Sequence, residues 1–287
     1  MKLNSINPGW TARPATMEDV DIVSELLDTC AIHMTGEIEQ RKDDLINEWK
    51  TPKWDLENST HLVFSEEGDL IGYSEVWDLE EPPVVPWCWF RFHPEYESSQ
   101  LGTYLLKWGE ARAAQAIERC PADARVSMQA GAISTYEPLG KILLENGWKV
   151  IRHSFQMRID FNGSEIPEPI IPEEIEFRPF NPETDLEAVY RADNEAFRDH
   201  FGHIEEPFEV GFPKFKHFFC ESENFDPSLW FILYDKDEVA AFSVNRKWSW
   251  EHKDIGWISS LGVRRPWRKK GLAKALLHHS FLEYQKR

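Results

Sequence analysis

The same series of structural signals occurs twice in this sequence, and this repeat constrains the fold more than any other feature. Each copy starts with an Arg-Pro pair, Arg13-Pro14 and later Arg178-Pro179, followed by acidic residues typical of a helix start. A predicted helix, two strands joined by an acidic turn, an apolar strand, a loop and another helix follow in both copies. The spacing of matched positions grows only from 165 residues, at Arg13 and Arg178, to 171 residues, at Leu105 and Leu276. The chain is therefore predicted to fold as two units with one plan.

A stretch without helical or strand periodicity separates the two copies. Residues 162–173 contain three prolines and an Asn-Gly pair, a composition typical of a linker. We therefore expect a first unit at residues 1–161 and a second unit at residues 174–287.

The two copies differ after their central helices. In the first copy, the pattern predicts a strand at residues 125–129, a helix around residues 139–144 ending at Gly147, and strands near Val150 and Met157. The second copy reaches Arg287 inside its central helix. The second unit is therefore expected to lack its final strand-helix-strand portion.

Composition limits the classes of partner. A chain of 287 residues with 41% apolar content can bury two cores, and its net charge of −18 opposes nonspecific binding to nucleic acids and anionic membranes. Residues 1–8 lack the apolar core of a signal peptide, and no apolar run is as long as a membrane span. We therefore expect a cytoplasmic protein. The cysteines are widely spaced and are expected to be reduced thiols: Cys30, Cys88, Cys120 and Cys220.

A cationic loop in the second copy stands out against this acidic background. Five of the seven residues from Arg264 to Lys270 are basic, and they lie between a predicted strand at residues 258–263 and a helix that follows Gly271. The first N–H groups of a helix have no intrahelical partner, and the helix dipole favours an anion there. Gly271 permits close approach of the backbone. The loop is therefore predicted to bind a diphosphate.

This loop resembles the coenzyme A loop of the GNAT superfamily of acetyltransferases. The family pattern Gln/Arg-x-x-Gly-x-Gly/Ala is matched by Arg268-Lys269-Lys270-Gly271-Leu272-Ala273. The resemblance implies acetyl-CoA as cofactor and an α/β (α+β) fold, with two tandem units that each have a mixed, mostly antiparallel sheet flanked by helices. It further implies that the backbone N–H of Val263 stabilises the thioester carbonyl. The cofactor-binding residues that it implies are Leu261, Gly262, Val263, Arg268, Lys269, Lys270, Gly271, Leu272, Ala273 and Lys274.

The corresponding loop of the first copy has lost this chemistry. Glu97 stands where Arg268 stands in the second copy, and Gln100 stands in place of Gly271. Carboxylates repel a pyrophosphate, so the first unit is expected to be structural or to face the substrate, although its Gly102 leaves residual cofactor binding open. An inactive first half before a working second half resembles the mycothiol synthase branch of the family.

The sequence leaves the general base open. Some relatives place a Glu eleven residues before the loop pattern, where this chain has Trp257. The leading candidates are Glu195 on the first helix of the second unit and Asp254 before the strand. Further candidates are Glu251, His200, His203, Glu205 and Glu206. The His200 and His203 pair lacks a clear third ligand, so no metal site is predicted.

The function predicted from these features is transfer of an acetyl group from acetyl-CoA to a primary amine of a small molecule, with the substrate held between the two units. A noncatalytic acyl-CoA-binding or regulatory module is the alternative. Nucleic-acid binding through Arg264 to Lys270 is a third interpretation, which the net charge opposes. We expect a monomer or homodimer. If the chain is complete in the cell, we expect cofactor affinity with weak or absent transfer.

Overall fold

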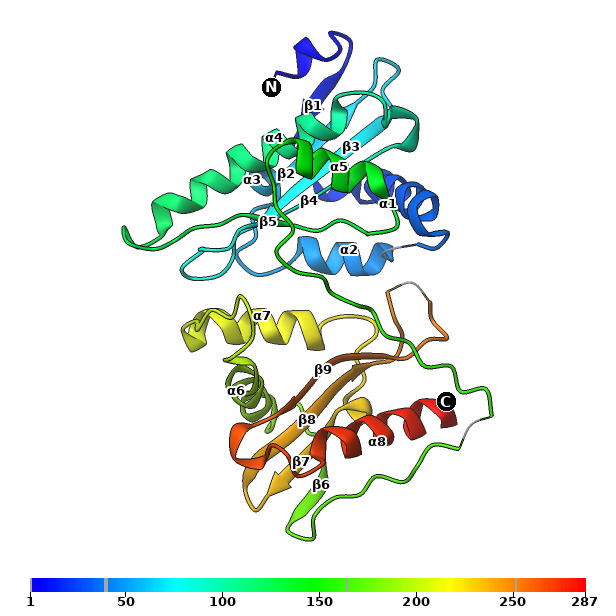
Figure 1. Cartoon of the computed structure of the whole chain (residues 1–287), viewed down its shortest axis with the longest axis vertical. Helices are drawn as coiled ribbons and strands as arrows, with labels where there is room; N and C mark the ends of the chain where they lie inside the picture. Colours follow the sequence, from blue (N-terminus) through cyan, green and yellow to red (C-terminus); the bar gives the residue numbers. More distant parts are fainter. Residues whose placement is uncertain (1, 39–40, 164, 251) are drawn as a thin grey trace. The chain divides into compact units, whose positions relative to one another are not determined.

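The computed structural model describes residues 2–38, 41–163, 165–250 and 252–287. The chain divides into two compact units, Met1–His153 and Ser154–Arg287 (Figure 1). The limits of the linker stay a prediction. Within the described residues, no helix is both long and apolar enough to cross a membrane.

The first unit is built on one mixed sheet. Its strands are β1 (Thr11–Arg13), β2 (Thr60–Phe64), β3 (Leu70–Trp77), β4 (Trp87–Phe92) and β5 (Gln129–Ala130). Its α-helices are α1 (Val20–Thr35), α2 (Lys42–Trp49), α3 (Leu56–Ser59), α4 (Leu101–Ala113) and α5 (Glu137–Glu145). Its 3-10 helices are η1 (Leu3–Ser5), η2 (Met17–Asp19), η3 (Pro94–Tyr96) and η4 (Ala114–Arg119). The strand order is β1-β2-β3-β4-β5, and only β4 and β5 pair in parallel.

Alternation along the strands builds two cores in this unit, one on each face of the sheet. Val63 packs with α4 and α5 on one face, whereas its neighbour Leu62 packs with α1 and α2 on the other. This is the period of two that a strand buried on both faces requires. The helices therefore cover both faces of the sheet.

The second unit repeats this arrangement with four antiparallel strands. Its strands are β6 (Ile175–Pro179), β7 (Phe231–Asp235), β8 (Glu238–Arg246) and β9 (Trp257–Val263), in the order β6-β7-β8-β9. Its helices are α6 (Leu186–Phe197), α7 (Phe208–Cys220), η5 (Pro227–Leu229), η6 (Arg265–Trp267) and α8 (Leu272–Lys286). Helices α6 and α7 pack on one face, and α8 packs on the other. The predicted fold class of two tandem α/β units is confirmed.

Two predicted strands of the first copy are wrong. Residues 148–161 form neither helix nor strand, and the side chains of Val150 and Met157 are 66% and 89% exposed. Apolar alternation favours an extended backbone, but a strand also needs a hydrogen-bonded neighbour, and no described residue supplies one. The predicted strand at residues 125–129 is reduced to Gln129–Ala130, whereas the predicted helix and its end at Gly147 are confirmed.

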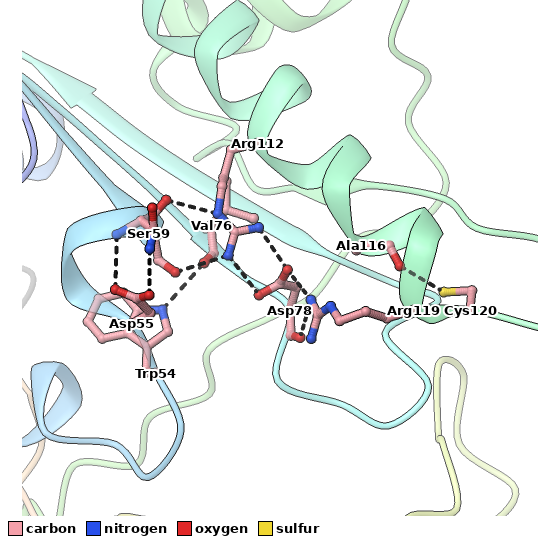
Figure 2. Close-up of polar contacts among 10 residues, drawn as sticks. Trp54, Asp55, Ser59, Val76, Asp78, Arg112, Ala116, Arg119 and Cys120 are labelled. Carbon is pink, nitrogen blue, oxygen red and sulfur yellow. Dashed lines mark hydrogen bonds and ion pairs between the residues drawn. The ribbon is translucent and has the colours of Figure 1, made fainter.

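A buried carboxylate holds the central helix of the first unit in place. Asp78, directly after β3, accepts a hydrogen bond of 2.8 Å from Arg112 on α4 and pairs with Arg119 on η4 (Figure 2). Arg112 also donates to the hydroxyl of Ser59, 3.2 Å away, at the end of α3. Hydrogen bonds between charged groups in such a buried position fix the elements that carry them. They therefore fix α4, and the loop at residues 97–100 lies directly before the first turn of this helix.

Candidate cofactor site

The loop before α8 exposes a row of backbone donors. Lys269 and Gly271 have left-handed φ values of 65° and 84°. The first hydrogen bond of the helix runs from the N–H of Ala275 to the carbonyl of Gly271, at 3.0 Å. In the described part of the chain, no N–H from Lys269 to Lys274 has a hydrogen-bond acceptor. We call residues 269–274 the loop cradle, and its backbone geometry suits an anion.

The basic side chains around the cradle divide into two groups. Arg268 is occupied, since it donates to the carbonyls of Val263 and Ala196 at 3.1 and 2.8 Å. It therefore ties the loop to β9 and to the end of α6. Lys270 lies 3.7 Å from Glu174, in a pair too exposed to hold it firmly. Lys269 is exposed and has no ion pair among the described residues, so its ammonium is available to an anion.

One edge of β9 has no neighbouring strand within the described residues. The N–H of Arg264 donates to the carbonyl of Ala240 at 3.0 Å, which makes these two residues a hydrogen-bonded pair of the antiparallel ladder. Pairs alternate along such a ladder, so Gly262 also bonds to β8, whereas the N–H groups of Leu261 and Val263 point to the free edge. The N–H of the predicted donor, Val263, thus points away from β8, where no described strand pairs with it. Leu261 presents a second N–H on the same edge.

Two further residues of the predicted loop site, Gly262 and Leu272, pack against the protein, and two others are exposed. A Cβ atom at Gly262 would lie 2.4 Å from the ring of Phe242 and 3.1 Å from Ala196, so this glycine allows α6 to approach the sheet. Leu272 is buried in the core under α8. Ala273 and Lys274 are exposed on the first turn of the helix. Contact of these residues with coenzyme A stays a prediction.

The predicted bases lie in unlike places. The carboxylate of Glu195 accepts a hydrogen bond of 2.6 Å from Arg264, which neutralises it. Asp254 is exposed before β9, at the end opposite the loop cradle, and the seven residues of β9 span roughly 20 Å. Glu205 pairs with Arg198 and Glu206 pairs with Lys214. Glu251 lies outside the described residues.

The structure brings forward a carboxylate that sequence reasoning missed. Asp193 on α6 accepts a hydrogen bond of 2.7 Å from the hydroxyl of Ser260 on β9. Its neighbours Ala192 and Ala196 are buried, so Asp193 borders the stripe of α6 that faces the sheet. An acidic residue beside the apolar stripe of an amphipathic helix is the signal that could have indicated it.

The matching loop of the first unit is closed by its own side chains. The hydroxyl of Ser99 accepts from the N–H of Leu101 at 3.1 Å, at the start of α4. The carboxylate of Glu97 lies 2.9 Å from the ring of His33 and accepts from the hydroxyl of Tyr136 at 2.5 Å. Burial and this carboxylate raise the pKa of Tyr136. One N–H at the start of α4 thus has a side-chain acceptor from the loop itself, and Glu97 is held by two side chains of its own unit.

Gly102, which the first unit retains, has a packing role. A Cβ atom there would lie 2.5 Å from Ile142 and 2.7 Å from the ring of Phe92. The glycine is therefore explained by the close packing of α4 between β4 and α5.

Comparison with known proteins decides the family. The acetyltransferase (GNAT) family profile matches residues 22–140 and 186–284, one stretch in each unit. The chain belongs to this family. Mycothiol acetyltransferase from Streptomyces scabiei (strain 87.22) is 28% identical to this GNAT chain over 223 residues, which are 77% of this chain and 65% of that protein. The chain thus matches less than two thirds of the length of that curated relative.

Solved structures show the tandem GNAT arrangement as well. A GCN5-related N-acetyltransferase from Sphaerobacter thermophilus aligns over 98% of this chain and 84% of its own, with 26% identity and a TM-score of 0.75. A tandem GNAT protein from the clavulanic acid biosynthesis pathway covers 96% of this chain and 86% of its own, with 13% identity and a TM-score of 0.59. At this identity the second likeness shows the fold alone.

Proposed function

We propose that the protein is an N-acetyltransferase that moves the acetyl group of acetyl-CoA to a primary amine of a small molecule, with the cofactor held by the second unit. The observation that carries the proposal is the loop cradle at residues 269–274, whose N–H groups have no acceptor within the described residues. The name of the relative from Streptomyces scabiei, an acetyltransferase of the small molecule mycothiol, supports a small-molecule acceptor.

The free edge of β9 supports the second part of the proposal. In this proposal the N–H groups of Leu261 and Val263, which point away from β8, would hold the pantetheine arm. Attack by an amine places negative charge on the thioester oxygen, and a preorganised N–H donor at that oxygen accelerates such a reaction roughly 100- to 1,000-fold. We assign that donor to Val263 or to Leu261, since alternation places both on the same edge.

Binding of coenzyme A to the full chain, measured by calorimetry, tests the cofactor site. The variant Lys269→Glu/Lys270→Glu should weaken binding about 100-fold, because it replaces two cations beside the phosphates with carboxylates. The control, Lys253→Glu/Lys286→Glu, makes the same change of charge elsewhere in the second unit. Lys253 precedes β9, and Lys286 lies at the far end of α8, each about 20 Å along its element from the cradle. Equal affinities of the two variants would refute the loop assignment.

Release of free thiol from acetyl-CoA in the presence of primary amines tests the reaction itself. Release that depends on an amine supports an acetyltransferase, whereas coenzyme A binding without release supports the noncatalytic acyl-CoA-binding module. The cytoplasmic location stays a prediction. The monomeric or homodimeric state also stays a prediction, and size-exclusion chromatography with light scattering checks it.

A further inference from the structure

Asp193 occupies a distinctive place beside the proposed reaction site. It lies on α6, the helix that packs against β8 and β9 (Figure 1). Its carboxylate accepts a hydrogen bond of 2.7 Å from the hydroxyl of Ser260. Ser260 directly precedes Leu261, the first residue with an N–H on the free edge of β9. Asp193 itself is partly buried and keeps some contact with solvent. Asp193 is thus partly exposed as a residue, and its carboxylate contacts the residue next to the edge that we assign to the thioester.

The surroundings of this carboxylate favour a bound cation. Burial raises the pKa of Asp193, while the hydrogen bond from Ser260 and the charges of His203 and His200 act in the opposite direction. Tyr190, one turn earlier on α6, adds a hydroxyl whose own pKa is raised by burial. No Lys or Arg pairs with Asp193 within the described residues. A partly desolvated carboxylate without a Lys or Arg partner is stabilised by a ligand that brings a positive charge.

A β-bulge adds a second polar group at this point of β9. Val244 pairs with Ser260 but Asn245 pairs with Ile258, so Ser259 is the extra residue of the bulge. The hydroxyl oxygen of Ser259 is buried and has no hydrogen-bond partner in the described part of the chain. Strand β9 therefore offers an unused hydroxyl next to the residue that contacts Asp193.

The other carboxylates near the site are less suited to this task. Glu195 is neutralised by Arg264, and Asp254 lies beyond the far end of β9. Among the acidic residues weighed for the second unit, Asp193 alone combines proximity to the free edge with the absence of a Lys or Arg partner among the described residues.

We propose that Asp193 binds the ammonium group of the acceptor and takes its proton. The inference rests on the proposed acetyl transfer. One N–H bond of the ammonium breaks, and its proton moves to the carboxylate. The freed nitrogen lone pair forms a C–N bond with the acetyl carbon as the C–S bond breaks. The leaving thiolate takes the second proton lost by the nitrogen, and Asp193 returns its own proton to water.

Two measurements on the full chain test this role. The first is thiol release with a panel of primary amines, namely ethanolamine, glucosamine and spermidine. The second is calorimetric binding of the same amines to protein saturated with coenzyme A. The test variant is Asp193→Asn, which keeps the shape and removes the charge. The control is Glu187→Gln, which removes an exposed carboxylate from the same helix.

The expected result is a loss of 100-fold or more in kcat with Asp193→Asn, together with loss of the acid limb of the pH profile. Affinity for the best amine should fall at least tenfold, and affinity for coenzyme A should stay unchanged. Thiol release that survives Asp193→Asn would overturn the inference and leave the proposed function standing. Amine binding that depends on Asp193 without thiol release would refute the proposed transfer and keep the ammonium site. Absence of both amine binding and release would refute both.

Discussion

The loops before α4 and α8 occupy equivalent places in the two units, and they differ in what fills the start of the helix. In the first unit, the hydroxyl of Ser99 accepts from the N–H of Leu101 at the start of α4, and Glu97 is held by His33 and Tyr136. In the second unit, the N–H groups of residues 269–274 have no acceptor among the described residues. The fold is retained because the cores under both sheets are retained. Affinity for an anion depends on a few residues at the helix start, which can change without disturbing those cores.

A second difference lies where a strand pair packs against the central helix, at β2–β3 and α4 in the first unit and at β7–β8 and α8 in the second. His61 on β2 pairs with Ser74 and stacks on Trp108 of α4, with ring centroids 4.8 Å apart. At the equivalent place in the second unit, Phe231 on β7 pairs with Ser243 and packs against His279 of α8, with centroids 4.5 Å apart. The imidazole lies on the strand in the first unit and on the helix in the second, and both units have a pair of rings in contact here. Contact between the rings is therefore what this position requires.

Exchange of the loops between the two units should have the largest effect on coenzyme A binding. Replacing residues 268–271 with the residues of the first loop, Glu-Ser-Ser-Gln, should weaken coenzyme A binding about 1,000-fold. The exchange removes charge-assisted contacts worth about 1.5–3 kcal/mol each and introduces a carboxylate. Calorimetry on the full chain measures the change.

The reverse exchange, which places Arg-Lys-Lys-Gly at residues 97–100, serves as the control. It should leave the stoichiometry at one coenzyme A per chain, because the first unit has only a narrow pocket here among the described residues. This pocket lies beside β4, and Tyr136 and Leu139 are among the residues that line it. A stoichiometry of two would show that the loop residues alone decide binding, and the contrast between the two units would then be one of sequence only.

These sites also show which inferences a sequence permits. The repeat and the charge reversal at Glu97 are local patterns, and they predicted both the tandem fold and the difference between the loops. The contacts that define the sites are not local. Glu97 meets Tyr136 across 39 residues, and Asp193 meets Ser260 across 67. Only the folded chain shows such pairs, because pairing depends on the packing of helices against the sheet.

The errors in the predicted strands have a similar cause. Alternation at Val150 and Met157 describes the chain by itself, whereas a strand is a property of two segments. The same holds for Glu195: its role as a base stays a prediction, and its partner Arg264, 2.6 Å away, lies 69 residues further along the chain.

The substitution His61→Phe sharpens the comparison of the ring pairs. Burial lowers the pKa of His61 to about 4, whereas the unfolded chain has a pKa near 6.5. Between these values the unfolded state binds more protons, so stability falls as the pH drops from 6.5 to 4, by up to about 3 kcal/mol. The variant carries the residue of the second unit and should lose this dependence.

Urea unfolding at pH 8, 6, 5 and 4 measures the effect, and the exposed His153→Phe is its control. At pH 8, His61→Phe should cost about 1 kcal/mol, since Tyr104 loses its hydrogen bond of 2.8 Å to the imidazole. If the free energy of unfolding of the variant falls with pH as steeply as that of the wild type, groups other than His61 cause the dependence.

Substitution of a glycine that has a left-handed φ separates the effect of backbone strain from the effect on coenzyme A binding. It has the smallest expected effect on affinity. Gly271 at the loop cradle and Gly36 at the end of α1 have φ values of 84° and 85°, and a Cβ atom at either would meet nothing within 4 Å. Gly271→Ala and Gly36→Ala should each lower the free energy of unfolding by about 1 kcal/mol through the same strain. Only Gly271→Ala should also weaken coenzyme A binding, by about fivefold, because under the proposed function the added methyl group would lie between the loop backbone and the phosphates. Equal loss of affinity in both variants would mean that the cradle acts through stability alone.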